Sequence, residues 1–226
     1  MTYDLYIGDK AFSSWSLRGW LMFRKFDIPV NEHLVGLYSG TMADDLANLA
    51  PARLVPAMRT PDGIVVGESN AMAETLAERH PDAGLWPDAP DARATARWLV
   101  SEMCAGFTAL RGECPMQLLR AYRDVPMSDA VKADLARIET LFAHARAVSV
   151  TTKGPLFGAY CLADVFYTPV AARVIGYGLS VSPATRAYFL ELLSDPLVQA
   201  WRKDALKVIY EPEPYRLDLP SDAWPV

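Results

Sequence analysis

The chain has 226 residues, of which 51% are hydrophobic and 22% charged, so it can bury a sizeable core and is not a disordered tail. Its 22 lysine and arginine residues against 27 acidic residues give a formal net charge of −5. A chain with that negative field is repelled by polyanions, so we expect neither a nucleic acid nor a membrane surface as a partner.

The cysteine pattern argues against cross-links and metal sites. Cys104, Cys114 and Cys161 are odd in number and show no CxxC spacing, and the three histidines are widely separated. No signal peptide precedes the first strand, and no apolar run approaches the ~18 residues of a membrane span. We therefore expect a cytoplasmic protein without a bound metal.

The first eighty residues alternate short apolar strands with helix-like segments, which is typical of an α/β unit. A Pro-Asp-Gly turn at 61–63 predicts a hairpin between the last two strands. Ser69 is a favourable N-cap for the helix that follows. The order β-α-β-α-β-β-α follows, with strands over 5–7, 32–37, 57–60 and 64–67, and helices over 15–26, 41–49 and 71–79.

Beyond residue 80 the pattern changes to helices alone. Residues 81–90 are rich in proline, aspartate and alanine and read as a linker. We therefore divide the chain into an α/β domain over 1–80, the linker over 81–90 and an all-α domain over 91–226. The helices predicted in the last part span 91–119, 128–148, 162–175, 183–193 and 196–206.

Four local motifs connect this organisation to a known family. They are SSWSLR at 13–18, PARLVPAM at 51–58, ESNAM at 68–72 after the Asp-Gly turn, and LWP at 85–87. Together they resemble the cytosolic glutathione S-transferases of the serine type, most closely the zeta-like bacterial members. The resemblance implies a thioredoxin-like N-terminal domain and a helical-bundle C-terminal domain. It also implies glutathione as co-substrate, a detoxification role and a homodimer.

Ser13 and Ser14 are the candidate catalytic residues. Either serine could simply cap the following helix. A hydroxyl at a helix N-terminus could also stabilise a bound thiolate, because it donates a hydrogen bond beside the positive end of the helix dipole. In the family this role matches Ser13, with Ser14 as the nearest alternative and Tyr6, on the first strand, as a further rival. Trp15 stands where zeta enzymes carry cysteine.

The resemblance assigns glutathione binding to Val55, Pro56, Glu68, Ser69 and Arg53. A cis-proline at 56 would expose the backbone of Val55 to the cysteine of glutathione, and an N-cap at Ser69 would receive a carboxylate. Glu68 would hold the ammonium group of the γ-glutamyl end. Arg53, or a group within 41–48, is the candidate for the remaining carboxylate.

An apolar electrophile is the expected second substrate, and its site is expected at Phe12, Trp15, Met103 and Phe107. The last two, with Trp98 and Met116, fit equally well as bundle core. A zeta-like cis-trans isomerase of the maleylacetoacetate type and a non-catalytic protein that keeps the fold are the alternatives. For the isomerase, Arg18 or Arg111 could meet the carboxylates of the substrate, although ordinary surface ion pairing explains them too.

Asp164 follows Cys161 by three residues at the predicted start of a helix, in the arrangement of a capping box. Cysteine replaces the usual hydroxyl residue, and its sulfur is a poor acceptor. We therefore expect a structural role for Asp164.

Overall fold

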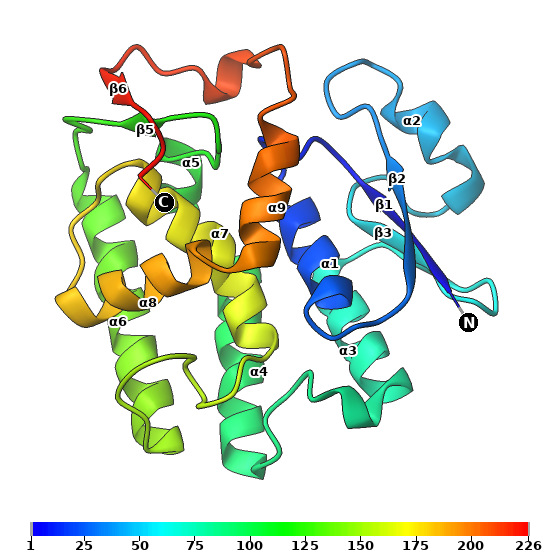
Figure 1. Ribbon diagram of the computed structural model, residues 1–226, viewed down its shortest axis with the longest axis horizontal. Helices are drawn as coiled ribbons and strands as arrows, with labels where there is room; N and C mark the ends of the chain where they lie inside the picture. The colour runs from blue at the N-terminus through cyan, green and yellow to red at the C-terminus, as the bar shows by residue number, and fades with distance from the viewer. Residues whose placement is uncertain (1, 226) are drawn as a thin grey trace.

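The computed structural model describes residues 2–225. A four-stranded sheet lies at one side of the molecule, and a helical part fills the other side (Figure 1). The sheet has the order β2-β1-β3-β4, with β1 parallel to β2 and the other neighbouring pairs antiparallel. Its elements are β1 (Tyr3–Ile7), α1 (Ser14–Arg24), β2 (Val30–Leu34), α2 (Met42–Asp45), the 3₁₀ turn η1 (Ala47–Leu49), β3 (Ala57–Arg59), β4 (Val65–Val66) and α3 (Ser69–Arg79).

Both faces of the sheet are buried. Successive side chains of a strand point to opposite faces, so each strand contributes to two hydrophobic clusters. Leu5 and Met58 point into the main core, which helices α1 and α3 share. Val35 and Ala57 belong to a smaller cluster on the other face, under α2 and η1. The predicted turn at 61–63 is present between β3 and β4, and Gly63 there adopts a φ of +91°, a value that glycine tolerates. The β-α-β-α-β-β-α order and the thioredoxin-like arrangement are confirmed.

The second part consists mainly of helices, with two departures from the sequence-based expectation. Its elements are η2 (Pro81–Ala83), α4 (Pro90–Ala105), α5 (Thr108–Glu113), β5 (Ala121–Tyr122), α6 (Asp129–Ser149), α7 (Leu162–Gly176), α8 (Pro183–Leu193), α9 (Pro196–Ala205), η3 (Glu213–Tyr215) and β6 (Ser221–Asp222).

The continuous helix predicted over 91–119 is wrong. Helix α4 ends before Gly106, and Phe107 takes a left-handed φ of +54° that starts the short α5 in a new direction. Pro115 follows soon after the end of α5. The chain then forms β5, which pairs antiparallel with β6 near the C-terminus, a small ribbon that the helix-only pattern did not predict.

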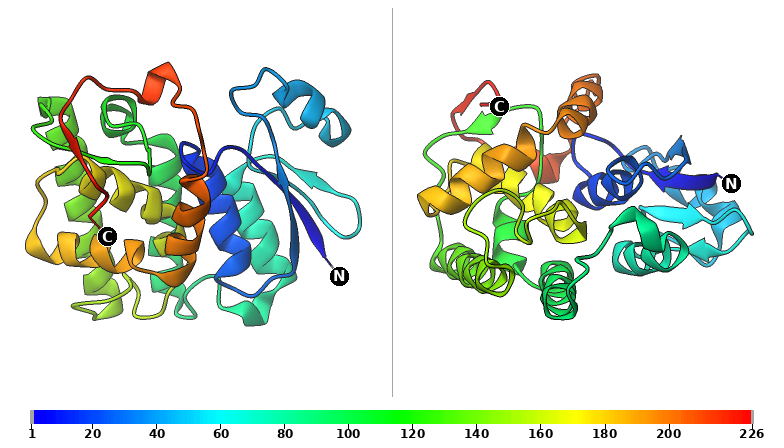
Figure 2. Two further views of the ribbon diagram at one scale, coloured as in Figure 1. Left: turned by 45° about the horizontal axis from the view of Figure 1, so that its top comes forward. Right: turned by 60° about the horizontal axis from the view of Figure 1, so that its bottom comes forward.

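Helix α7 is buried along its whole length and packs against α1, α4 and α8 (Figure 2). At its start, the Asp164 carboxylate accepts hydrogen bonds from the backbone N–H of Cys161 at 2.9 Å and of Leu156 at 3.2 Å. The hydroxyl of Tyr188 donates a third, at 2.7 Å. The structural role expected for Asp164 is thus confirmed.

Helices α1 and α9 lie side by side where the two parts meet (Figure 1). Trp201 is fully buried there, its ring 5.3 Å from that of Trp20, and its indole N–H donates to the Lys10 carbonyl at 2.8 Å. These contacts fix α1, and with it the cavity described below, against the helical part. None of the helices within residues 2–225 has the length and apolar character needed to cross a membrane.

Candidate functional site

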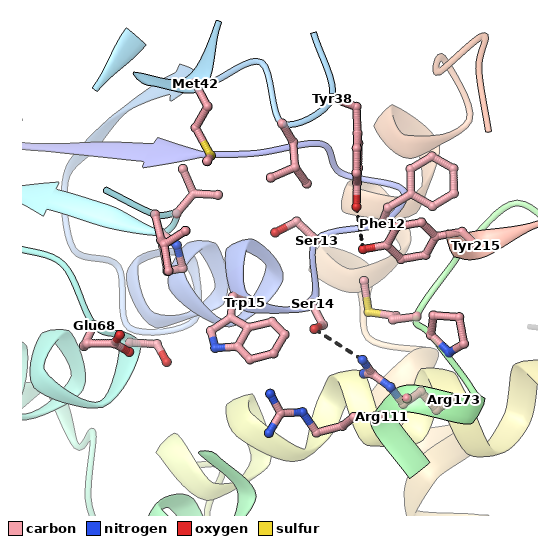
Figure 3. A pocket seen from close by; sticks show the side chains of 18 of the residues that line it. Phe12, Ser13, Ser14, Trp15, Tyr38, Met42, Glu68, Arg111, Arg173 and Tyr215 are labelled. Atoms are coloured by element: carbon pink, nitrogen blue, oxygen red, sulfur yellow. Dashed lines mark hydrogen bonds between the residues drawn. The ribbon is translucent and has the colours of Figure 1, made fainter. Parts of the chain in front are cut away.

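A cavity of about 560 Å³ opens between the two parts of the molecule, beside the N-terminus of α1 (Figure 3). From the α/β side it is lined by the start of α1, the loop before β3 and the start of α3. From the other side it is lined by α5, α7 and the C-terminal segment. The lining residues used below are Phe12, Ser13, Ser14, Trp15, Tyr38, Val55, Pro56, Glu68, Ser69, Arg111, Met116, Arg173 and Tyr215.

Ser13 is the N-cap of α1 and lines the cavity. Its Oγ accepts a hydrogen bond from the backbone N–H of Ser16 at 3.2 Å, which satisfies one of the free donors of the first turn. Its O–H donates to Ser16 Oγ at 2.8 Å, and that oxygen also accepts the N–H of Gly8 at 2.9 Å. Because a hydroxyl turns freely about its C–O bond, the Ser13 proton can be redirected to a ligand in the cavity.

Ser14, the first residue of α1, also lines the cavity but has a different partner. The Nη2 of Arg173, on α7, lies 3.5 Å from Ser14 Oγ (Figure 3). Tyr6 does not line this cavity; it pairs with His33 across the sheet, and the two rings stack at 4.5 Å. The structure therefore places two serine hydroxyls, and not the Tyr6 hydroxyl, at the cavity.

The loop before β3 places the backbone of Val55 beside these serines. The Val55–Pro56 peptide is cis, as the resemblance implied, and Ala50–Pro51 is cis as well. Within residues 2–225 the N–H and C=O of Val55 form no backbone hydrogen bond, so both are open to an extended ligand. An amide donor and acceptor from one residue can pair with a peptide-like ligand in the manner of an added strand.

Glu68 and Ser69 lie where α3 begins, and here the expected cap is wrong. Glu68 is the N-cap residue and Ser69 the first helical residue, and the Glu68 side chain makes no capping hydrogen bond. Ser69 is buried, whereas Glu68 is exposed at the rim. The first-turn N–H groups and the Ser69 hydroxyl suit a carboxylate, and the Glu68 carboxylate suits an ammonium group beside it.

Two tyrosines, Tyr38 and Tyr215, line the side of the cavity opposite Glu68 (Figure 3). Tyr38, in the loop after β2, donates its hydroxyl hydrogen bond to the Tyr215 hydroxyl at 2.7 Å (Figure 3). Tyr215 in turn packs against Phe12, with ring centroids 4.8 Å apart. Burial, followed by that hydrogen bond, raises the pKa of Tyr38 above its usual value, so the Tyr38 hydroxyl stays neutral at ordinary pH.

Comparison with known proteins supports the family that the motifs indicated. Residues 12–79 match the family model described as glutathione S-transferase, N-terminal domain. The chain therefore resembles the glutathione S-transferase family.

Relatives of the chain include maleylacetoacetate isomerase of Rattus norvegicus, 27% identical over 79% of this chain and 81% of the relative. Glutathione S-transferase GstB of Escherichia coli K12 is 26% identical over 79% and 88% of the two chains. Among solved structures, a glutathione transferase homologue from Burkholderia with bound glutathione has a TM-score of 0.66 at 22% identity, covering 92% of this chain and 99% of that chain. That structure shows the fold.

Several residues predicted for the site lie elsewhere in the structure. Arg53 is exposed and does not line the cavity. Met103 and Phe107 are 3% and 4% exposed and belong to the core: Met103 Sδ accepts a contact from Arg18 Nη1 at 3.0 Å, and Phe107 faces Tyr167. Both are thus corrected to bundle core, the alternative that helical spacing had left open.

Of the other four aromatic and methionine candidates, Phe12, Trp15 and Met116 line the cavity, and Trp98 lies on the surface. Neither Arg18 nor Arg111 forms the surface ion pair that the sequence favoured: Arg18 is buried and Arg111 lines the cavity. Sequence reasoning missed Arg173 altogether. A signal was present in the sequence, because Arg173 is the single basic residue of the mainly apolar helix α7.

Proposed function

We propose that this protein binds glutathione in the cavity and transfers its thiolate to an apolar electrophile. The observation that carries the proposal is the convergence of the Ser13 hydroxyl, the free backbone of Val55 and the Glu68–Ser69 pair on one cavity. In this arrangement Glu68 and Ser69 hold the γ-glutamyl group, Val55 pairs with the cysteine backbone, and the sulfur reaches Ser13.

The chemistry follows from the place of Ser13 at the N-terminus of α1. The positive end of the helix dipole and an O–H donor both favour a thiolate over a thiol. The thiolate is the nucleophile, so Ser13 activates glutathione without forming a bond to it. Holding the electrophile beside that sulfur supplies the rest of the rate enhancement through proximity.

Glutathione binding is tested by isothermal titration calorimetry on the wild-type protein and on Glu68→Gln and Ser69→Ala. Each substitution removes a charged or charge-assisted contact, so we expect the dissociation constant to rise roughly tenfold. Glu78→Gln, on an exposed turn of the same helix α3, is the matched control and should bind as the wild type does. Absence of binding at millimolar glutathione would contradict the proposal.

Turnover is tested separately with 1-chloro-2,4-dinitrobenzene as a neutral electrophile. Conjugation in the wild type and its loss in Ser13→Ala support the transferase function. Glutathione binding without turnover on any electrophile would instead favour the non-catalytic alternative.

Glutathione-dependent cis-trans isomerisation is the second candidate, favoured by the similarity to maleylacetoacetate isomerases over 79% of the chain. In that reaction the thiolate adds to a cis double bond, rotation follows, and the thiolate leaves. Maleate is a suitable probe, because its conversion to fumarate would consume no glutathione. Loss of glutathione together with maleate would indicate stable addition and exclude isomerisation.

We further propose that the protein is a cytoplasmic homodimer. The proposal is supported by the family and by three cysteines that are all free thiols, as a reducing compartment would keep them. Light scattering in solution tests the dimer, and a mass near 25.0 kDa would contradict it.

A further inference from the structure

Three arginines gather on the side of the cavity that faces the helical part. Arg173 and Arg111 line the cavity, and Arg18 lies buried behind Trp15, its guanidinium 5.0 Å from the ring centroid. Within residues 2–225 none of the three forms an ion pair with a carboxylate. Among the described lining residues Glu68 is the single acidic one, and Figure 3 shows it at the far end of the cavity from Arg173.

Arg173 is the clearest anomaly of the three. Its side chain projects from the fully buried helix α7, and the residue is 4% exposed. Nη1 donates to the Pro169 carbonyl at 3.3 Å and Nη2 reaches Ser14 Oγ only at 3.5 Å, while the buried Nε has no partner among the described residues. Burying a charged guanidinium with so few hydrogen-bond partners is costly in free energy. We therefore infer that Arg173 binds a ligand that enters the cavity.

Arg111 approaches the same space from α5. Its Nη1 donates to the carbonyls of Cys104 and Gly106 at 3.0 and 3.3 Å, which fixes the side chain at the break between α4 and α5. The guanidinium lies 4.5 Å from the Trp15 ring centroid. Its other nitrogens make no hydrogen bond within the described part of the chain, and Figure 3 shows the group directed into the cavity.

The arginines stay charged at neutral pH. Burial first, and then the neighbouring guanidinium groups of Arg111 and Arg18, lower the pKa of Arg173 to about 10. Glu68 acts on the charge of Arg18, but within residues 2–225 none of the three arginines is paired with a carboxylate. Positive charge therefore accumulates on this side of the cavity, which is the electrostatic setting of an anion site.

We propose that Arg173, Arg111 and Ser14 form a carboxylate-binding subsite for the electrophilic co-substrate. The proposal rests on the proposed transferase function and narrows its second substrate to an apolar electrophile that carries a carboxylate. A guanidinium with two free N–H groups suits a planar carboxylate, and the Ser14 hydroxyl adds a third donor beside it. The two serines then have separate tasks: Ser13 serves the sulfur of glutathione and Ser14 the anion of the electrophile.

The cavity also has room for the apolar part of such a substrate. Phe12, Trp15, Met116 and Tyr215 line the space next to the subsite. A flat aromatic or unsaturated acid fits this combination, with its carboxylate on the arginines and its ring or double bond among these side chains.

Binding without any thiol is the first test. The probes are 4-chloro-3-nitrobenzoate and its neutral amide, 4-chloro-3-nitrobenzamide, titrated by calorimetry into the wild type, Arg173→Met and Arg173→Lys. We expect the wild type to prefer the acid, Arg173→Met to lose that preference by roughly tenfold or more, and Arg173→Lys to lie between them. Arg186→Met removes a charge from an exposed position of α8 and should leave the preference unchanged.

Stability separates a binding role from a structural one. Methionine replaces the buried, poorly paired charge by a somewhat shorter, unbranched apolar chain. Arg173→Met should therefore unfold at the same or a higher denaturant concentration than the wild type. A protein that needs Arg173 for its structure would instead unfold earlier, and that result would overturn the proposal.

Turnover gives the second test. The thiolate of glutathione forms a C–S bond at C4 of the probe, the C–Cl bond breaks with its electron pair on chloride, and the thiol proton goes to solvent. We expect kcat/KM for the acid, relative to the amide, to fall roughly tenfold in Arg173→Met and to fall also in Ser14→Ala.

Three further outcomes would overturn the subsite: equal affinity of the wild type for acid and amide, an unchanged preference in Arg173→Met, or a loss of glutathione affinity in Arg173→Met with the acid preference intact. The last would assign the arginine to a carboxylate of glutathione itself. The first test contains no thiol, so the titrations of the acid and the amide can be interpreted even if the protein proves not to be a transferase.

Discussion

Gly19 of helix α1 lies directly against Pro56, so closely that a Cβ at position 19 would stand 2.7 Å from the Cβ of the proline. Real Cβ atoms essentially never approach another atom this closely. The contact joins the helix that carries Ser13 to the loop that presents Val55. It therefore sets the distance between two parts of the proposed glutathione site.

Gly19→Ala should destabilise the protein for this reason. The gain in helix propensity, about 1 kcal/mol, is outweighed by overpacking of about 1–3 kcal/mol, and glutathione should bind more weakly as the loop shifts. Gly112→Ala is the matched control, since a Cβ on that helical glycine meets no atom within 4 Å. Urea unfolding should rank the three proteins Gly112→Ala, wild type, Gly19→Ala in falling stability; the reverse order would refute the packing argument.

Tyr188→Phe should lower stability by about 1–3 kcal/mol, because it removes one of three donors to the buried Asp164 carboxylate. Asp164→Ala should cost more, since it leaves two backbone N–H groups and the tyrosine hydroxyl without their acceptor. Thermal and urea unfolding measure both.

The control for the hydroxyl deletion is Tyr6→Phe. Its hydroxyl makes no hydrogen bond within residues 2–225, so stability should stay the same. Unchanged turnover in this variant would also agree with the location of Tyr6 away from the cavity. A Tyr188→Phe protein as stable as the Tyr6→Phe protein would show that Asp164 does not depend on the hydroxyl.

Sequence patterns predicted many of the helices and strands of this structure, and the predictions that were wrong have physical causes. Strand alternation and cap residues predicted the α/β order, and helices from Pro183 and Pro196 begin where proline at the first position indicated. Apolar periodicity did not show the break at Gly106, because Met103, Phe107 and Leu110 are buried at near-helical spacing on either side of the turn.

The candidate site shows the same limit. Residues adjacent in the chain, such as Glu68 and Ser69, can be paired from local patterns. Arg173 and Ser14 are 159 positions apart, and only the packing of α7 against α1 brings them together. Likewise, helical spacing cannot decide which side of α4 faces a cavity, so Met103 was assigned to the site although it lies in the core.

Tyr38 and Tyr215 should stabilise one another across the cavity. Their hydroxyls lie 2.7 Å apart and connect the loop after β2 to the C-terminal segment. A double-mutant cycle with Tyr38→Phe and Tyr215→Phe should give a coupling of about 0.5–1 kcal/mol in unfolding free energy. Because the pair borders the cavity, KM for the electrophile should rise roughly two- to fivefold in either variant. Zero coupling with unchanged KM would show that the contact is incidental.

Acid should weaken the contact between α9 and the loop after β1. Hydrogen bonds from Lys207 and then Lys10, at 2.6 and 2.9 Å, lower the pKa of Asp204 to about 2. A carboxyl with a depressed folded-state pKa stabilises the protein above its unfolded value of about 3.9, and that contribution is lost as pH falls towards 2.

Asp204→Asn should therefore flatten the loss of stability between about pH 4 and pH 2, while costing less than about 1 kcal/mol at neutral pH because the group is partly exposed. Urea unfolding across this pH range measures the effect. Asp218→Asn is an exposed control and should keep the wild-type slope. If the unfolding free energy fell equally steeply with pH in all three proteins, Asp204 would not be the group responsible.

The pKa of the glutathione thiol bound to the protein tests the central claim most directly. It is measured from the ultraviolet absorbance of the thiolate during a pH titration of the complex, with the wild type, Ser13→Ala and Ser14→Ala compared at saturating glutathione. We expect the wild type to lower the thiol pKa below its free value of about 8.5, Ser13→Ala to return it towards that value, and Ser14→Ala to leave it near the wild-type result. A bound thiol with the free pKa, or one that Ser13→Ala does not change, would contradict the account.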